Sequence, residues 1–171
     1  MKSPVRPWLV IAIGNPSRGD DALGPCLMAR LSAWLDEPEQ ADYQAQTELL
    51  EDFQLQIDYV LDLQDRARIL LIDAAAQFST VSTRTLARTP ALHHYRALPD
   101  EHTGPLSHAL SPEALLAVWQ QINPTQAIPP LEVLAVLGEA FELGAPLSLQ
   151  AEAHCAQTWS YLQNWFKSPA A

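Results

Sequence analysis

The feature that most constrains the fold is a continuous apolar run at residues 8–13, which ends abruptly at Gly14. An apolar run without alternation predicts a strand that is buried on both faces, as in a parallel sheet. Residues 23–35 then carry apolar side chains at helical spacing, and Pro38 cannot continue that helix. A buried strand, a short turn and an amphipathic helix in this order favour an α/β fold.

The rest of the chain repeats this alternation. Further strands are predicted at residues 67–72 and 131–137, with a weaker candidate at 43–50 and an alternating edge strand at 80–87. Helices are predicted at residues 55–64, from Ser111 onward and at 148–166. We therefore expect one α/β domain over residues 1–171, with three layers. Its mostly parallel, twisted sheet would have about five strands and helices on both faces.

The charge of the chain limits its partners. The 20 acidic and 10 basic residues give a net charge of -10, which argues against binding to nucleic acid or to an anionic membrane surface. No apolar run reaches the length of a membrane span, and the first residues do not resemble a signal peptide. The two cysteines form no CxxC pair. A soluble, cytoplasmic protein without membrane insertion is expected.

Carboxylates stand where two of the predicted strands end. Asp20 and Asp21 lie in the turn after the first strand, and Asp73 ends the strand at residues 67–72. In parallel sheets, binding sites form beyond the carboxyl ends of the strands. Adjacent side chains diverge, so we expect Asp20 to cap the following helix and Asp21 to face the site.

A phosphate-binding loop is the competing interpretation of this turn. The turn has neither a GxGxxG nor a GxxxxGK(S/T) pattern, and two carboxylates at a helix start would repel a phosphate. A generic nucleotide-binding α/β domain is therefore a weaker hypothesis.

Of the five histidines, His108 is the best candidate for a site residue. It precedes a helix start at Ser111-Pro112-Glu113, where Ser111 can cap the helix and Pro112 suits its first position. We expect His93 and His94 to lie at the surface and His154 to be partly exposed; His102 stays undecided.

Two carboxylates and one imidazole suit a divalent first-row metal ion. The chain has no HExxH helix and no GxSxG turn, and neither cysteine is a credible nucleophile. A zincin, a serine hydrolase and a cysteine hydrolase are therefore poor interpretations.

These residues resemble a known family, the maturation endopeptidases of nickel-iron hydrogenases. The resemblance spans most of the chain, and its most specific part is the turn at residues 12–25, in which Asp21 matches the first metal contact. Asp73 matches the second contact, an Asp in an Asp-Ala pair that ends a strand, and His108 matches the third. Residues 136–148 are similar to the last strand of the family and the loop that follows it. Ala12 and Ala22 depart from the glycines that many members have.

The resemblance implies an endopeptidase that removes the C-terminal extension of a nickel-iron hydrogenase large subunit after nickel insertion. It implies that Asp21, Asp73 and His108 are both the metal contacts and the catalytic residues, and that the substrate supplies the nickel. Another divalent ion would occupy the site in isolation. The partner would be the large-subunit precursor. The alternative is a non-catalytic assembly factor that binds the metallated large subunit on the same fold.

Overall fold

The computed structural model describes residues 5–78, 84–100 and 110–168. The strands are β1 (Trp8–Ile13), β2 (Thr47–Asp52), β3 (Arg68–Ala75), β4 (Arg84–Arg88), β5 (Leu92–Arg96) and β6 (Leu131–Leu137). The α-helices are α1 (Leu23–Leu35), α2 (Ala41–Gln46), α3 (Pro112–Ile122) and α4 (Leu149–Lys167). Short 3-10 helices lie at η1 (Gly19–Ala22), η2 (Pro38–Gln40) and η3 (Ile57–Leu61). Within these described ranges, no helix combines the length and the apolar character that a membrane span requires.

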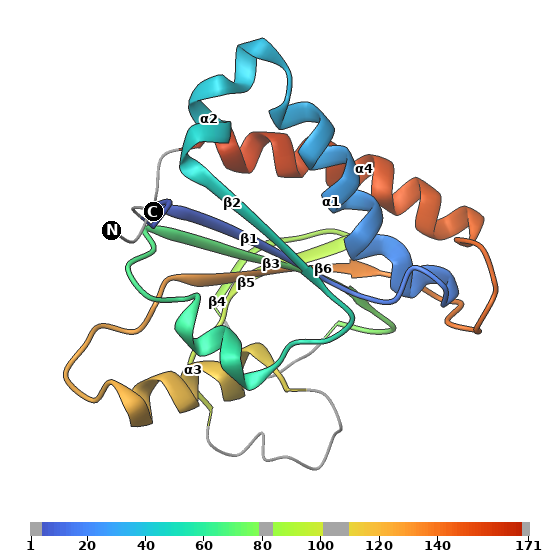
Figure 1. The fold of residues 1–171 in the computed structure, drawn as a ribbon. Coiled ribbons are helices and arrows are strands. Elements are labelled where there is room, and N and C mark those ends of the chain that lie inside the picture. Colours follow the sequence, from blue (N-terminus) through green and yellow to red (C-terminus); the bar gives the residue numbers. More distant parts are fainter. Residues whose placement is uncertain (1–4, 79–83, 101–109, 169–171) are drawn as a thin grey trace.

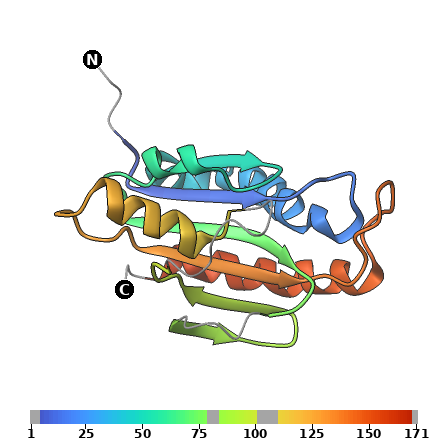
Figure 2. The ribbon, with the colours of Figure 1, turned by 90° about the horizontal axis from the view of Figure 1, so that it is seen from below.

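The strands form one sheet in the order β2-β1-β3-β6-β5-β4 (Figures 1 and 2). β2, β1, β3 and β6 are parallel to one another, whereas β5 and β4 are antiparallel to their neighbours. The predicted α/β class with a mostly parallel sheet is confirmed. The predicted edge position of the strand in residues 80–87 also agrees with β4, although residues 79–83 lie outside the described part.

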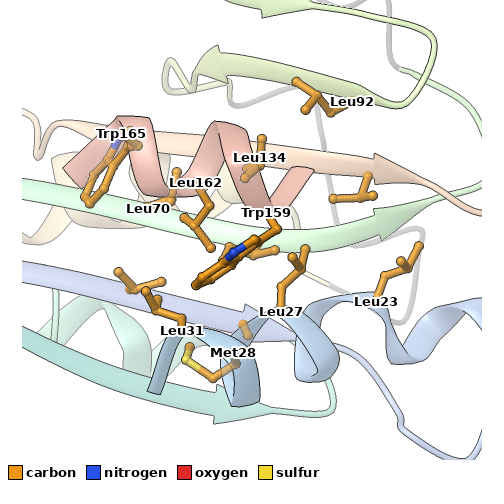
Figure 3. Close-up of a cluster of buried hydrophobic side chains, with 14 of the residues drawn as sticks. Leu23, Leu27, Met28, Leu31, Leu70, Leu92, Leu134, Trp159, Leu162 and Trp165 are labelled. Atoms are coloured by element: carbon orange, nitrogen blue, oxygen red, sulfur yellow. The ribbon is translucent and has the colours of Figure 1, made fainter. Parts of the chain in front are cut away.

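Helices cover both faces of the sheet, so the predicted three layers are present. Val10 and Ala12 of β1 join a core beneath α1 and α4, which Figure 3 shows in close-up. The alternate residues Leu9, Ile11 and Ile13 join a second core beneath α3 and η3. Because side chains of a strand alternate between faces, a strand buried on both faces needs an unbroken apolar run. The apolar run at residues 8–13 meets this requirement.

β5 is the strand that the sequence did not predict, and its histidines correct a further expectation. His93 and His94 are only 2% and 4% exposed, so the predicted surface position is wrong for both. The His94 ring lies 2.6 Å from the Tyr161 hydroxyl and 2.9 Å from the carboxylate of Glu132, which also accepts from Trp165. These long-range partners let a polar sequence occupy an interior strand.

Two further boundaries differ from the expectation. The weak strand at residues 43–50 is divided between the short helix α2 and β2, and the helix expected at residues 55–64 is reduced to η3. The predicted caps of α3 are confirmed, because the Ser111 side chain accepts from the Ala114 N–H and Pro112 begins the helix.

The β1–α1 turn is fixed by one buried carboxylate. Asp20 is fully buried, and its side chain accepts the N–H groups of Glu139, Ala140 and Ser148 and the Ser148 hydroxyl, at 2.7–3.0 Å. It does not cap η1 or α1, so the predicted capping role is wrong. Asp20 instead joins the turn to the loop between β6 and α4, 119 to 128 residues away.

Two glycines make this close approach possible. A Cβ atom on Gly138 would lie 2.7 Å from the Cβ of Asp20. Gly19 has a φ of +53°, and a Cβ there would meet the Ala140 carbonyl oxygen at 2.4 Å. Any side chain at either position would push the turn and the loop apart.

We predict that Asp20→Asn lowers the free energy of unfolding by about 2–3 kcal/mol, because an amide cannot accept at both of its atoms and loses the charge. Burial by itself raises the pKa of Asp20, but the bonds from Ser148, Glu139 and Ala140 outweigh burial and lower it. The stabilisation is thus fully present above the ordinary pKa of Asp and is lost as the pH falls through the lowered one. Urea unfolding at pH 7 and at acid pH measures both effects.

Asp58→Asn is the matched control, because Asp58 is exposed. Equal stability of the Asp20→Asn and Asp58→Asn proteins at pH 7 would contradict the assignment of Asp20 as the joint.

Candidate active site

The first predicted carboxylate lies where β1 ends. Gly14 leaves the strand with a φ of +144°, and a Cβ there would meet the Asp21 carbonyl oxygen at 2.0 Å, so the turn requires glycine. The Asp21 carboxylate accepts the N–H of Asn15 at 2.9 Å, which folds the turn back on itself. The Gly14 N–H donates to the Asp52 carbonyl at the end of β2. Asp21 thus sits at the carboxyl edge of the sheet.

The second predicted carboxylate lies at the same edge. Asp73 belongs to β3, opposite Ala135 of β6, and strand alternation places its side chain on the α3 side with Leu71. It is half-buried. Burial raises the pKa of Asp73 to about 7; the N–H of Ala74 opposes this shift, and the negative charge of Asp21 adds to it. The structure therefore brings Asp21 and Asp73 within electrostatic reach of each other.

The described residues supply no cation to this pair. Their ion pairs join Arg66 to Glu48, and His94 and Arg96 to Glu132. Within the same ranges, no three His, Cys, Asp or Glu side chains gather closely enough to hold a metal ion. The third predicted residue, His108, lies outside the described residues, as does His102. The metal-binding and catalytic roles of Asp21, Asp73 and His108 stay predictions.

Two buried polar residues near Asp73 were not singled out from the sequence. The Tyr95 hydroxyl and the Glu113 carboxylate share a hydrogen bond, and both groups are almost fully buried. Burial raises the pKa of each, and the charge of Asp73 also raises that of Tyr95. Glu113 lies in the first turn of α3. Because Glu113 is buried and hydrogen-bonded to Tyr95, the first turn of α3 lies near the face of the sheet that carries Asp73.

A groove borders this edge on the α4 side. It has a volume of about 550 Å³, and its lining includes Ala76, Pro90, Glu139, Gln150 and His154. His154 is 3% exposed, so its expected partial exposure is wrong. Its Nδ1 donates to the Leu137 carbonyl at 2.7 Å, which leaves Nε2 as an acceptor beside the Gln150 amide at 2.8 Å. The groove therefore contains an imidazole whose two nitrogens are both hydrogen-bonded.

Similarity between this chain and known proteins is found in structure and not in sequence. No protein-family model matches the chain, and no curated protein matches it. Solved structures do match over almost the whole length.

The NiFe hydrogenase maturation protease HycI from Thermococcus kodakarensis KOD1 superposes with a TM-score of 0.62 and 15% identity, over 95% of this chain and 94% of that chain. The hydrogenase maturating endopeptidase HybD from E. coli has a TM-score of 0.62 and 19% identity, over 94% and 91%. The hydrogenase 2 maturation peptidase from Thaumarchaeota archaeon SCGC_AB-539-E09 has a TM-score of 0.58 and 19% identity, over 92% and 96%. With its two carboxylates at the carboxyl edge of the sheet, the chain has the fold of the nickel-iron hydrogenase maturation proteases.

Proposed function

We propose that the chain is an endopeptidase that removes the C-terminal extension of a nickel-iron hydrogenase large subunit after nickel insertion. The observation that carries the proposal is the pair of carboxylates, Asp21 and Asp73, at one edge of a fold shared with such proteases. The substrate is then the large-subunit precursor, and its own nickel is the element that the site recognises.

The electrostatics of the pair support a cationic substrate. Asp73 lies partly out of water beside a like charge, and none of the ion pairs between described residues neutralises it. An arrangement of this kind is unfavourable until a cation arrives. Carboxylate oxygens suit a divalent ion, and one imidazole would complete a mixed ligand set with open positions. We infer that His108, four residues before α3, supplies that imidazole.

The parts of the site would act as follows. Asp21 and Asp73 hold the ion of the substrate, and the Asn15 N–H fixes the orientation of the Asp21 carboxylate. A bound divalent ion polarises a carbonyl group or activates a water molecule. With a pKa of about 7, Asp73 can also hold a proton or release one near neutral pH, as a general base requires.

We predict that the chain shortens a nickel-loaded large-subunit precursor and leaves the nickel-free precursor intact. Asp21→Asn, Asp73→Asn and His108→Ala should each lower the cleavage rate by at least about 100-fold, because each removes a ligand of the ion. Mass spectrometry of the precursor measures the C-terminal shortening.

Asp58→Asn serves again as the exposed control and should cleave at the wild-type rate. Equal cleavage of both precursor forms would refute recognition of nickel. Full activity of Asp21→Asn would refute its assignment, and binding without shortening would favour the non-catalytic assembly factor.

The raised pKa of Asp73 predicts a loss of fold stability at high pH that can be measured without substrate. In the folded chain Asp73 keeps its proton up to about pH 7, whereas an unfolded Asp releases it near its ordinary value of 3.8. The folded state therefore binds more protons between these values, and stability falls as the pH rises through this range. We predict that Asp73→Asn is more stable than the wild type by roughly 1–3 kcal/mol at pH 8, and by much less at pH 5.

Urea unfolding in the presence of a chelator measures this difference. A gain that is the same at pH 5 and pH 8 would mean that the charge of Asp73 is not its source. A variant that is more stable and also inactive would identify Asp73 as a residue kept for function at the expense of stability.

A further inference from the structure

The two edges of the sheet differ in how open they are. At one edge, β4 carries the exposed residues Arg84 and Arg88, and its pairing shifts register between Thr85 and Ala87. Positive charges and bulges are devices that keep other strands from adding to an edge. At the other edge, β2 pairs with β1 in an unbroken parallel register over its whole length. It contains no Lys, Arg or Pro. The β2 edge therefore has no bulge and no positive charge, and its charged side chains, Glu48, Glu51 and Asp52, are all negative.

Because backbone groups of a strand alternate in direction, the N–H and C=O groups of β2 that do not pair with β1 can be identified. The Asp52 carbonyl accepts from Gly14 of the β1–α1 turn, so Asp52, Leu50 and Glu48 point their backbone groups toward β1. Leu49 and Glu51 then point theirs outward, where no strand of the described chain pairs with them. At the start of β2, the Thr47 carbonyl is already occupied by the Arg6 side chain at 2.7 Å. The usable edge thus begins after Thr47 and leads toward the carboxyl end of β2.

A pocket lies along this edge on the α1 side. It has a volume of about 310 Å³, and its lining includes Leu35, Leu49, the carboxylates of Asp36 and Glu48, and Arg6, whose guanidinium donates to the Thr47 carbonyl. When a strand adds to a sheet, its main chain gives affinity and its alternate side chains enter such pockets. Leu35 and Leu49 supply apolar walls for the stem of a side chain, and Asp36 supplies a negative charge for its end.

The charges around the edge select a basic partner. Glu51 is exposed, and neither Glu51 nor Asp36 takes part in an ion pair between described residues. Arg66 is held by the Glu48 carboxylate at 2.7 Å, and it also donates to the Arg6 carbonyl. Among the carboxylates at the edge, Glu51 therefore remains available to a partner, whereas Glu48 is paired with Arg66 and one oxygen of Asp36 accepts from the Gln44 amide at 2.7 Å. Acidic chains, which have the same charge as Glu51, would be repelled.

We propose that the outer edge of β2 docks an extended segment of the substrate protein that carries Lys or Arg side chains and adds to the sheet as a further strand. The identity of the partner rests on the function proposed above. β2 forms the upper margin of the sheet in Figure 2, and β1 lies between β2 and β3. The added strand would lie three strand spacings from Asp73, which is about 14 Å, or four to five residues of extended chain. A docked segment can therefore present a bond a few residues away to Asp21 and Asp73.

The test uses the wild-type chain and the nickel-free precursor, which the proposed function leaves intact, so that the complex is not consumed. Hydrogen exchange of this complex should show the amides of Leu49 and Glu51 slowed at least tenfold, with the β4 amides unchanged. In the same background, Glu51→Pro removes an outward N–H and should weaken binding about tenfold relative to Glu51→Ala, which keeps it. Thermal unfolding checks that both variants fold.

Glu51→Lys provides a test that does not depend on proline. It keeps the N–H but reverses the charge, and it should weaken binding of a basic segment in low salt more than in high salt. Unchanged exchange at Leu49 and Glu51 in a complex that forms would overturn the proposal, as would equal binding by the Pro and Ala variants.

The remaining outcomes separate the two proposals. Slow exchange at Leu49 and Glu51 in the free chain, rising with its concentration, would show that a second copy covers the edge, and the docking proposal would be wrong. Protection by a precursor that the chain never shortens, even when that precursor is nickel-loaded, would refute the proposed function and leave the docking surface standing. Failure of the nickel-free precursor to bind would overturn the docking proposal, whereas shortening of the nickel-loaded precursor would still support the proposed function.

Discussion

The position of the whole candidate site depends on the buried carboxylate of Asp20. Its hydrogen bonds to Glu139, Ala140 and Ser148 attach the first turn of the chain to the loop that precedes the last helix. A fully buried charge is tolerable because the Asp20 carboxylate accepts four hydrogen bonds. Asp21 is the next residue, so the hydrogen bonds that hold Asp20 also fix the position of the Asp21 side chain at the sheet edge. The turn is then a rigid part of the sheet edge.

Much of this architecture was predictable because it follows from local sequence. The apolar run of β1 and the periodic helix α1 predicted a buried parallel sheet, and Ser111-Pro112 predicted the start of α3. The placement of Asp21 and Asp73 beyond strand ends followed from the general rule for parallel sheets. What failed depends on partners remote in sequence. β5 resembles a loop in sequence because the hydrogen-bond partners of its histidines, Glu132, Tyr161 and Thr85, lie elsewhere in the chain. Asp20 resembles a helix cap because its partners lie in the distant loop between β6 and α4.

The surroundings of Asp20 and Asp73 act on the pKa of these two carboxylates in opposite directions. Asp20 is a charge whose surroundings favour its ionised form, whereas Asp73 is a charge whose surroundings disfavour it. The first stabilises the fold, and the second leaves an unmet attraction for a cation at the sheet edge. The two roles are separated by the number of backbone N–H groups that each carboxylate receives, which the residue type alone does not reveal. Only the three-dimensional contacts distinguish the aspartate that stabilises the fold from the one proposed to bind the ion.

The joint made by Asp20 has a consequence for how the protein is made. The residues that Asp20 binds lie 119 to 128 positions further along the chain. A ribosome releases them long after β1 and α1 have emerged, so the turn cannot reach its final shape until the loop between β6 and α4 is available. A nascent or truncated chain can form much of the sheet and still lack an ordered edge. The enzyme proposed here would thus remain inactive until synthesis has passed Ser148.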